Sequence, residues 1–234
     1  MASRLNDRTR GRWESDQAVL AATAAGLQLK LGSNARRARI VGTVAVARPD
    51  GRCDDFEVEI RYPGLQPREL PDTYDPVGRF PPDPDRHVES DGRFCLWVPE
   101  AAPTRAFRAA GGLALYLCRV QEFICLQLMY EARRKHGVEP YWPGDAWGHG
   151  DDGHCEWIEQ TTAALDPVAL QRLLGAVKHP GKPSRRCPCG SGRRLGNCHK
   201  QWLRDVRHTW QTRPPAQFAA YQVLEERRAT PPAS

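Results

Sequence analysis

Apolar and polar residues alternate most regularly in two short runs of the N-terminal half. A period of two residues is typical of a strand with one buried and one solvated face. Between the runs, Pro49-Asp50-Gly51 favours a turn. We therefore expect two antiparallel strands joined there, with the apolar positions Ile40, Val44 and Val46 on the first strand and Phe56, Val58, Ile60 and Tyr62 on the second.

Three other segments follow the 3.6-residue period of an amphipathic helix. The first is expected at residues 15–30, capped by Ser15 or Asp16. The second, at residues 111–137, is the longest, and the third, at residues 166–177, has Pro167 in its first turn. Prolines exclude a regular helix from residues 63–84. Residues 141–157, rich in Trp, His, Gly and Asp, are expected to form a loop.

The 234 residues are 40% hydrophobic and 26% charged, which suits one domain with a small appendage. The longest apolar-rich stretch, residues 111–130, is interrupted by Arg119, Gln121 and Glu122, so we expect no membrane partner. No apolar core of a signal peptide follows the N-terminal arginines, and the eight cysteines form no disulfide framework. A cytoplasmic, reducing compartment is expected.

A single cysteine, Cys95, follows a Gly turn in the run from Arg86 to Trp97, eight residues after His87. Ahead of it come the expected helix, the strands and the proline-rich crossing, and the long helix comes after it. This order resembles the ubiquitin-conjugating enzymes over residues 17–137. The resemblance implies an α+β fold with an N-terminal helix, an antiparallel β-meander and a long C-terminal helix.

The resemblance also implies a chemistry. Cys95 would carry a ubiquitin-like protein as a thioester, received from an activating enzyme, and would pass it to an amine, such as a lysine of a protein target. His87 would orient the loop, and Ser90 or Asp91 would hold the oxyanion or the incoming lysine. The better-known members have His-Pro-Asn where this chain has His87-Val88-Glu89, so the familiar Asn is absent. The divergence looks like that of the bacterial relatives.

Each of these residues also has an ordinary structural interpretation. Free cysteines are commonly buried, His87 suits a surface, and Ser90 and Asp91 suit a turn. Cys118 and Cys125, seven residues apart on an apolar helix, are expected in the core, and Cys53 lies in the hairpin turn.

Near the C-terminus, Cys187-Pro188-Cys189-Gly190-Ser191-Gly192 is followed by Cys198-His199. Four Cys and His residues around a Gly-rich turn are the ligand set of a closed, structural zinc site. The run resembles the SEC-C zinc motif in its Cys-His form, which implies Zn²⁺ on Cys187, Cys189, Cys198 and His199. A second metal site in the set His149, Asp151, Asp152, His154 and Cys155 is a weaker hypothesis, because the spacing fits no known pattern and a loop explains it.

The domains expected are a conjugating-enzyme-like domain at 15–177, a basic linker at 178–186, the zinc motif at 187–200 and a helical or partly disordered tail at 201–234. The zinc module would recruit a partner. One alternative is a non-catalytic binding protein with the same fold. Another alternative is a zinc-containing nucleic-acid binder, which is favoured by the basic residues Arg185, Arg186, Arg193, Arg194 and Lys200 and by the net charge of +6. It is less favoured than conjugation because aromatic residues that could stack on bases are sparse there.

Overall fold

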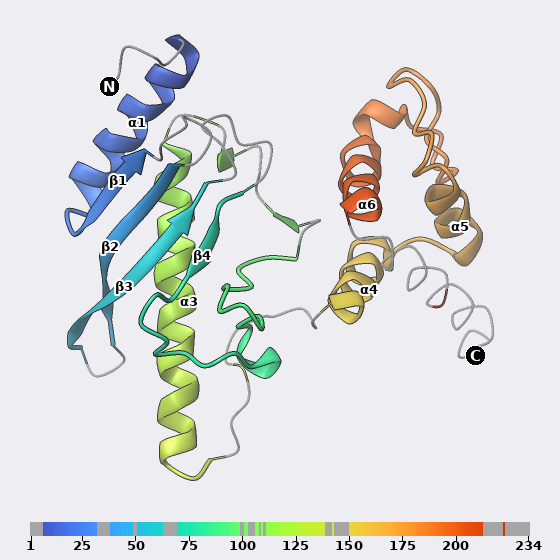
Figure 1. The fold of residues 1–234 in the computed structure, drawn as a ribbon. Coiled ribbons are helices and arrows are strands. Elements are labelled where there is room, and N and C mark those ends of the chain that lie inside the picture. The colour runs from blue at the N-terminus through green and yellow to red at the C-terminus, as the bar shows by residue number, and fades with distance from the viewer. Residues whose placement is uncertain are drawn as a thin grey trace. The chain divides into compact units, whose positions relative to one another are not determined.

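The two alternating runs form the centre of a four-stranded antiparallel sheet with the order β1-β2-β3-β4 (Figure 1). The strands are β1 (Leu27–Leu31), β2 (Ala38–Ala47), β3 (Cys53–Arg61) and β4 (Asp72–Tyr74). In the β2–β3 pair, Ile40 lies opposite Ile60 and Val44 lies opposite Phe56. All four side chains are buried, whereas the intervening positions Asp55, Glu57 and Glu59 stay at least partly exposed. The predicted hairpin and its alternation are confirmed.

This computed structural model describes residues 7–31, 38–48, 51–62, 70–98, 101–102, 106–107, 109, 111–138, 142, 150–212 and 222. In that part of the chain it is a mixed α+β protein with the one sheet and five α-helices. The chain divides into two compact units, unit 1 (residues 1–96 and 103–145) and unit 2 (residues 97–102 and 146–234).

Unit 1 is built around α3 (Gly112–Lys135), which runs along one face of the sheet (Figure 1). Gln121 of α3 donates a hydrogen bond from Nε2 to the Ala45 carbonyl of β2. By length and composition α3 could cross a membrane, but half of its apolar stretch is buried within the protein. Packing against the sheet explains its apolar character. The buried stripe follows the predicted helical period and includes Leu113, Leu117, Val120, Phe123, Ile124 and Leu128.

The N-terminal helix differs from the prediction of residues 15–30. Helix α1 spans Asp7–Thr23, and Leu27, which fits the helical period, instead begins β1. The prediction was wrong here because pairing with β2 decides the conformation: a turn at residues 24–26 follows α1, and Leu27 then lies opposite Gly42 of β2. Within the proline-rich crossing, the structure adds the short strand β4, which pairs with Arg61 and its neighbours in β3.

Unit 2 is helical and has its own hydrophobic core. Helix α4 (Gly150–Thr162) occupies much of the segment predicted as a loop, and α5 (Pro167–Gly175) begins as predicted, with the Asp166 carboxylate accepting a hydrogen bond from the Ala169 N–H at 2.8 Å. Helix α6 (Lys200–Thr212) follows the Cys/His segment. The apolar faces of these helices bury one cluster, which includes Ile158, Leu170, Leu173, Leu203, Val206 and also Cys187 and Cys189.

The division into units differs from the domains predicted from sequence. The break falls at Asp145/Ala146 and not at residues 178–186, so α4 and α5 belong with the Cys/His segment. The expected linker is itself held by backbone hydrogen bonds: Leu195 N–H donates to the Arg185 carbonyl at 2.7 Å, and Gly196 N–H donates to that of Pro183 at 2.9 Å. Residues 201–212 of the expected tail form α6, and the rest of that tail, apart from residue 222, lies outside the described residues.

The β1–β2 pairing predicts a specific effect of Gly42→Ala. Gly42 has φ +135°, and a Cβ there would overlap the carbonyl oxygen of Gly26. We expect a loss of more than about 3 kcal/mol in the free energy of unfolding, measured by urea denaturation. The matched control is Gly51→Ala, which also has positive φ (+81°) but open space at the Cβ, and should cost only about 1 kcal/mol. Equal losses would contradict this pairing.

Candidate active site and metal centre

Cys95 lies at the end of a short hairpin formed by residues 87–95. Val88 pairs with Phe94, and the Cys95 N–H donates a hydrogen bond to the His87 carbonyl at 2.8 Å. At the tip, Glu89 N–H donates to Arg93 O at 2.8 Å, which leaves a three-residue loop with Gly92 at φ +80°. This is the hairpin geometry that needs a residue in the left-handed region, and glycine adopts it without strain.

The hairpin is attached to the edge of the sheet and to α3. Phe94 N–H donates to the Thr73 carbonyl of β4 at 2.8 Å, and the Phe94 ring stacks on Phe123 of α3 with centroids 4.6 Å apart. Phe94 and Leu96 are buried, whereas Cys95 between them is only partly buried. Because side chains alternate along an extended segment, Cys95 lies on the side opposite its two anchored neighbours. Cys95 is therefore a partly exposed residue on a backbone that is fixed on both sides.

A buried arginine fixes the start of the hairpin. Arg86 ends a short 3₁₀ helix, η2 (Pro84–Arg86), and is only 3% exposed. Its guanidinium donates from Nε to Gln127 Oε1 at 3.0 Å and from Nη2 to Glu131 Oε1 at 2.8 Å, and Gln127 in turn donates from Nε2 to the Arg86 carbonyl. We call this set of three α3-linked contacts the Arg86 clamp. A buried cation is tolerated only when it is paired and hydrogen-bonded, so the clamp specifies where the chain enters the hairpin.

His87 caps η2 in the left-handed region (φ 57°, ψ 33°), the one described non-glycine residue with positive φ. Its side chain is largely buried, and its ring lies 4.8 Å from the Trp142 ring, centroid to centroid. The alternative interpretation of His87 as an ordinary surface histidine is therefore wrong. The backbone hydrogen bond to Cys95 and the packed ring give His87 a positioning role in the hairpin.

Ser90 and Asp91 lie at the tip of the hairpin, both exposed. The Asp91 carboxylate accepts a hydrogen bond from the Arg93 N–H at 3.1 Å, which stabilises the turn. Cys95 follows Gly92, the last residue of the three-residue loop, by three positions, which is about 10 Å along an extended strand. The geometry gives these two residues a place in the turn and does not bring them to the sulfur.

The other cysteines outside the metal cluster differ in exposure. Cys53 and Cys118 are exposed and Cys125 is partly buried, so the expectation that Cys118 lies in the core is wrong. Cys118 follows Leu117 on α3 and falls just outside the buried stripe. Cys53 is the first residue of β3 and the other two lie on α3, whereas Cys95 lies on the hairpin that is attached to both elements.

In unit 2, the structure brings together the four residues that the sequence predicts as metal ligands. One ligand atom from each of Cys187, Cys189, Cys198 and His199 lies within 4.8 Å of the others, so the cluster could hold a metal ion. The turn at Gly190–Gly192 and the short 3₁₀ helix η4 (Leu195–Asn197) bring the two halves together. His199 Nδ1 lies 3.3 Å from Cys187 Sγ and 3.1 Å from Cys198 Sγ, and Cys189 Sγ lies 3.7 Å from Cys198 Sγ.

The ionisation of the cluster reflects its surroundings. Burial raises the pKa of Cys187, and burial lowers the pKa of His199, which favours the neutral imidazole that a metal requires. At Cys189, burial opposes ionisation, but hydrogen bonds from Ser191 outweigh it and hold the pKa of this thiol below its ordinary value. Ser191 Oγ lies 3.2 Å from Cys189 Sγ and 3.5 Å from Cys198 Sγ, so one hydroxyl serves two sulfurs.

The second hypothetical metal site is not assembled in the described residues. His154 is buried on α4 and its Nε2 accepts a hydrogen bond from Trp210 Nε1 at 3.3 Å, while Asp152 is exposed. His149 lies outside the described residues. The segment contributes to the core of unit 2 through Trp157, whose ring stacks on Trp202 at 6.0 Å between centroids.

Sequence reasoning missed the residues that position the candidate nucleophile. Gln127 lies within the apolar stripe of α3, and a polar residue at such a position signals a buried partner. Arg119 of α3, noted only as an interruption of an apolar stretch, donates from Nε to the Leu96 carbonyl at 3.0 Å. Comparisons of the chain with protein-family models, curated proteins and solved structures find no match. The candidate site therefore depends on the geometry of its own residues.

The Arg86 clamp predicts that Arg86→Met loosens the Cys95 hairpin. The variant leaves Gln127 Oε1 without its guanidinium partner, and we expect a loss of about 2 kcal/mol in unfolding free energy. Amide hydrogen exchange should rise across residues 87–95, and iodoacetamide should alkylate Cys95 faster, as read by peptide mass spectrometry.

The matched control is Arg79→Met. The guanidinium of Arg79 lies 5.9 Å from the centre of the Phe80 ring, as that of Arg86 does at 5.8 Å, but Arg79 is exposed. Its loss should change the free energy of unfolding by less than about 0.5 kcal/mol and leave amide exchange in the hairpin unchanged. Unchanged exchange in both variants would show that the hairpin does not depend on the clamp.

Proposed function

We propose that unit 1 is a conjugating enzyme, related in fold to the ubiquitin-conjugating enzymes, that carries a ubiquitin-like protein as a thioester on Cys95. The observation that carries the proposal is the position of Cys95: partly exposed, between two buried residues, on a hairpin fixed to β4 and α3. The element order supports it as well. A helix, an antiparallel four-strand meander, a cysteine segment and a long helix follow one another as in that family.

The proposed chemistry has two steps. The Cys95 thiolate attacks the carbonyl carbon of the modifier's thioester on an activating enzyme; a new C–S bond forms, the old C–S bond breaks and the activating enzyme's thiolate leaves. An amine, in our proposal a lysine of a protein target, then attacks the Cys95 thioester. A C–N bond forms, the Cys95 thiolate leaves and the amine loses a proton. Exchange between thioesters is nearly balanced in free energy, so an accessible thiolate is sufficient.

The surrounding residues have positioning roles in this proposal. His87 and Arg119 hold the backbone on either side of the nucleophile through the contacts His87 O···H–N Cys95 and Arg119 Nε–H···O Leu96. Ser90 and Asp91 form the turn. With the familiar Asn absent, we propose a backbone N–H as the donor to the oxyanion.

The proposal predicts a thiol-sensitive adduct. Incubation with its activating enzyme and ubiquitin-like protein, and with ATP, should give a slower band on non-reducing electrophoresis that dithiothreitol removes. Cys95→Ala should abolish the band because no sulfur remains to form the bond. Cys95→Ser should give a band that resists dithiothreitol, because an oxyester does not exchange with thiols.

The matched controls are Cys53→Ala and Cys118→Ala, which remove the two other exposed cysteines of unit 1. Both should charge as the wild type does. An adduct that survives Cys95→Ala, or that disappears in either control, would contradict the assignment of Cys95.

We further propose that the metal of unit 2 is a structural zinc ion. Around a tetrahedral zinc with sulfurs at about 2.3 Å and an imidazole nitrogen at about 2.0 Å, two sulfurs lie about 3.8 Å apart, and a sulfur and the nitrogen lie about 3.5 Å apart. The Cys189–Cys198 separation of 3.7 Å matches the first value, the two sulfur–nitrogen separations of 3.3 Å and 3.1 Å are shorter than the second, and all four ligand atoms lie within 4.8 Å of one another. The separation of 3.7 Å between Cys189 and Cys198 is also far beyond the roughly 2 Å of a disulfide. All four ligands come from the protein, which is typical of a structural site.

The metal would stabilise the whole of unit 2. Cys187 and Cys189 are at the same time candidate ligands and members of the core formed by α4, α5 and α6. Binding would release the thiol protons, and affinity should fall as the pH falls because protons compete for the sulfurs. We propose that the stabilised unit recruits a partner for unit 1.

Purified protein should contain one zinc ion per chain by elemental analysis. Chelation should raise amide exchange through α4, α5 and α6 together, while α3 and the sheet stay protected because unit 1 has its own core. Cys198→Ser should lose the metal, and Cys53→Ser, in unit 1, should retain it. Purified protein without zinc would contradict the metal site. Chelated protein in which α4, α5 and α6 remain protected from exchange would contradict its structural role.

A further inference from the structure

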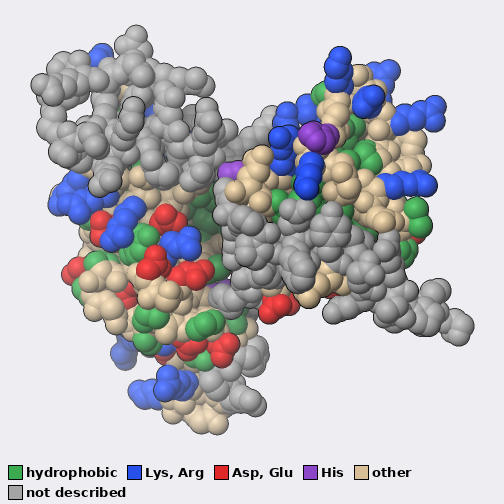
Figure 2. Space-filling model, turned by 45° about the vertical axis from the view of Figure 1, so that its right-hand side comes forward, with side chains coloured by type: hydrophobic (Ala, Val, Ile, Leu, Met, Phe, Trp, Pro, Cys, Tyr) green, Lys and Arg blue, Asp and Glu red, His purple; other side chains and the backbone are tan. Residues whose placement is uncertain are grey.

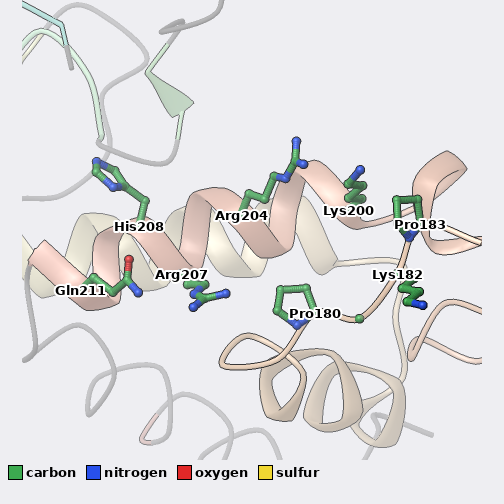
Figure 3. Close-up of a pocket in the computed structure, with 9 residues that line it drawn as sticks. Pro180, Lys182, Pro183, Lys200, Arg204, Arg207, His208 and Gln211 are labelled. Carbon is green, nitrogen blue, oxygen red and sulfur yellow. The ribbon is translucent and has the colours of Figure 1, made fainter. Parts of the chain in front are cut away.

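A groove of about 430 Å³ in unit 2 is lined mainly by basic and polar side chains. One wall is α6, and the other is the loop at residues 180–183 (Figure 3). The side chains that give the groove its character are Lys182, Lys200, Arg204, Arg207, His208 and Gln211.

The α6 side of the groove is the solvated face of an amphipathic helix. Lys200, Arg204 and Arg207 follow one another at intervals of four and three residues, which places them on one face. The opposite face carries Trp202, Leu203, Val206 and Trp210, all buried in the core of unit 2. From residue 200 to residue 211 the basic face extends about 16 Å along the helix axis.

The charge around the groove is almost entirely positive. Between residues 178 and 207 the sequence has nine Lys and Arg and one acidic residue, Asp205. Asp205 accepts a hydrogen bond from Gln201 at 2.7 Å and does not line the groove. Where the structure describes the chain, none of Lys182, Lys200, Arg204 and Arg207 pairs with a carboxylate.

Four exposed arginines extend this surface from the groove onto the Cys/His segment. The loop that forms the second wall is joined to that segment by the backbone hydrogen bonds of Arg185 and Pro183 described above. Figure 2 shows several Lys and Arg side chains gathered on one part of the described surface of unit 2, whereas Lys and Arg are interspersed with Asp and Glu on unit 1. The exposed arginines are Arg185, Arg186, Arg193 and Arg194.

The composition of the groove favours a polyphosphate over a folded protein surface. Protein interfaces have apolar and aromatic residues at their centre and few lysines. Here the two tryptophans of α6 face the core, and Trp202 Nε1 donates to Thr161 Oγ1 at 2.9 Å. A nucleic-acid strand presents one charge per about 3.4 Å, so a basic face of about 16 Å spans about five phosphates.

We propose that this groove binds the phosphate backbone of a nucleic acid. The contacts would be electrostatic and independent of sequence, because the aromatic side chains of α6 are turned away and cannot stack on bases. The proposal concerns residues outside both the Cys95 hairpin and the metal cluster, and it holds whether or not Cys95 forms a thioester.

The test is fluorescence anisotropy with the full, metal-loaded chain and labelled single-stranded and duplex oligonucleotides of about 20 nucleotides, over a series of salt concentrations. We expect the logarithm of the wild-type binding constant to fall linearly with the logarithm of the salt concentration. The variant Lys182→Gln/Arg204→Gln/Arg207→Gln should weaken binding at least about tenfold at about 100 mM salt and reduce the slope by about 2 to 3. It leaves the four metal-cluster residues and their immediate neighbours unchanged.

The matched control is Arg133→Gln/Arg134→Gln/Lys135→Gln at the C-terminal end of α3, which removes the same charge from unit 1. It should change affinity less than about twofold.

If the groove variant loses metal or unfolds at a lower temperature than the wild type, the single exposed change Arg207→Glu serves instead and should weaken nucleic-acid binding more than Arg134→Glu. No wild-type binding at low salt, equal losses in variant and control, or tighter binding of a polyglutamate of matched charge would overturn the proposal.

Discussion

The buried guanidinium of Arg86 is the interaction on which the candidate active site depends. A cation that is 3% exposed is stable only with partners, and two residues of α3, Gln127 and Glu131, supply them. To reach both partners the chain must complete η2, and η2 ends in the left-handed turn at His87 from which the hairpin starts. The position of Cys95 is therefore tied to the longest helix of unit 1 through a hydrogen-bonded charge as well as through apolar packing.

In unit 2, the candidate metal cluster and the hydrophobic core share two residues. Cys187 and Cys189 belong to the hydrophobic core and to the candidate metal cluster at once, so ligand geometry and core packing constrain the same two side chains. One face of α6 completes that core, and the opposite face presents the basic groove. A metal that orders the Cys/His segment would in this way also order the exposed arginines beside the groove.

The features that sequence predicted well have strong local signals. The alternation of Phe56, Val58 and Ile60 and the apolar stripe of α3 are long and regular, and the Cys/His spacing is specific to metal ligands. The features that it missed depend on contacts distant in the chain. Leu27 fits a helical period but pairs with Gly42, and β4 has only three residues, too few for a period to show.

Helix α4 was missed for a related reason. Gly150, Gly153 and His154 have low helix propensity, and the helix is stabilised by the packing of Trp157 and Ile158 in the core of unit 2. The partners of Arg86 in the clamp lie 41 and 45 positions further along the chain, too far for a local sequence pattern to show them. The polar residue Gln127 in the apolar stripe of α3 was the signal in the sequence that indicated a buried partner.

The most direct test of the central claim is to express the Cys95→Ser variant in the host cell and purify it under denaturing, non-reducing conditions. Peptide mass spectrometry would then locate any covalent adduct. The account predicts the C-terminus of a small ubiquitin-like protein in ester linkage to residue 95, together with the matching dithiothreitol-labile adduct on Cys95 of the wild type. A wild-type Cys95 peptide found only as the free thiol, with no adduct at residue 95 of the variant, would contradict it.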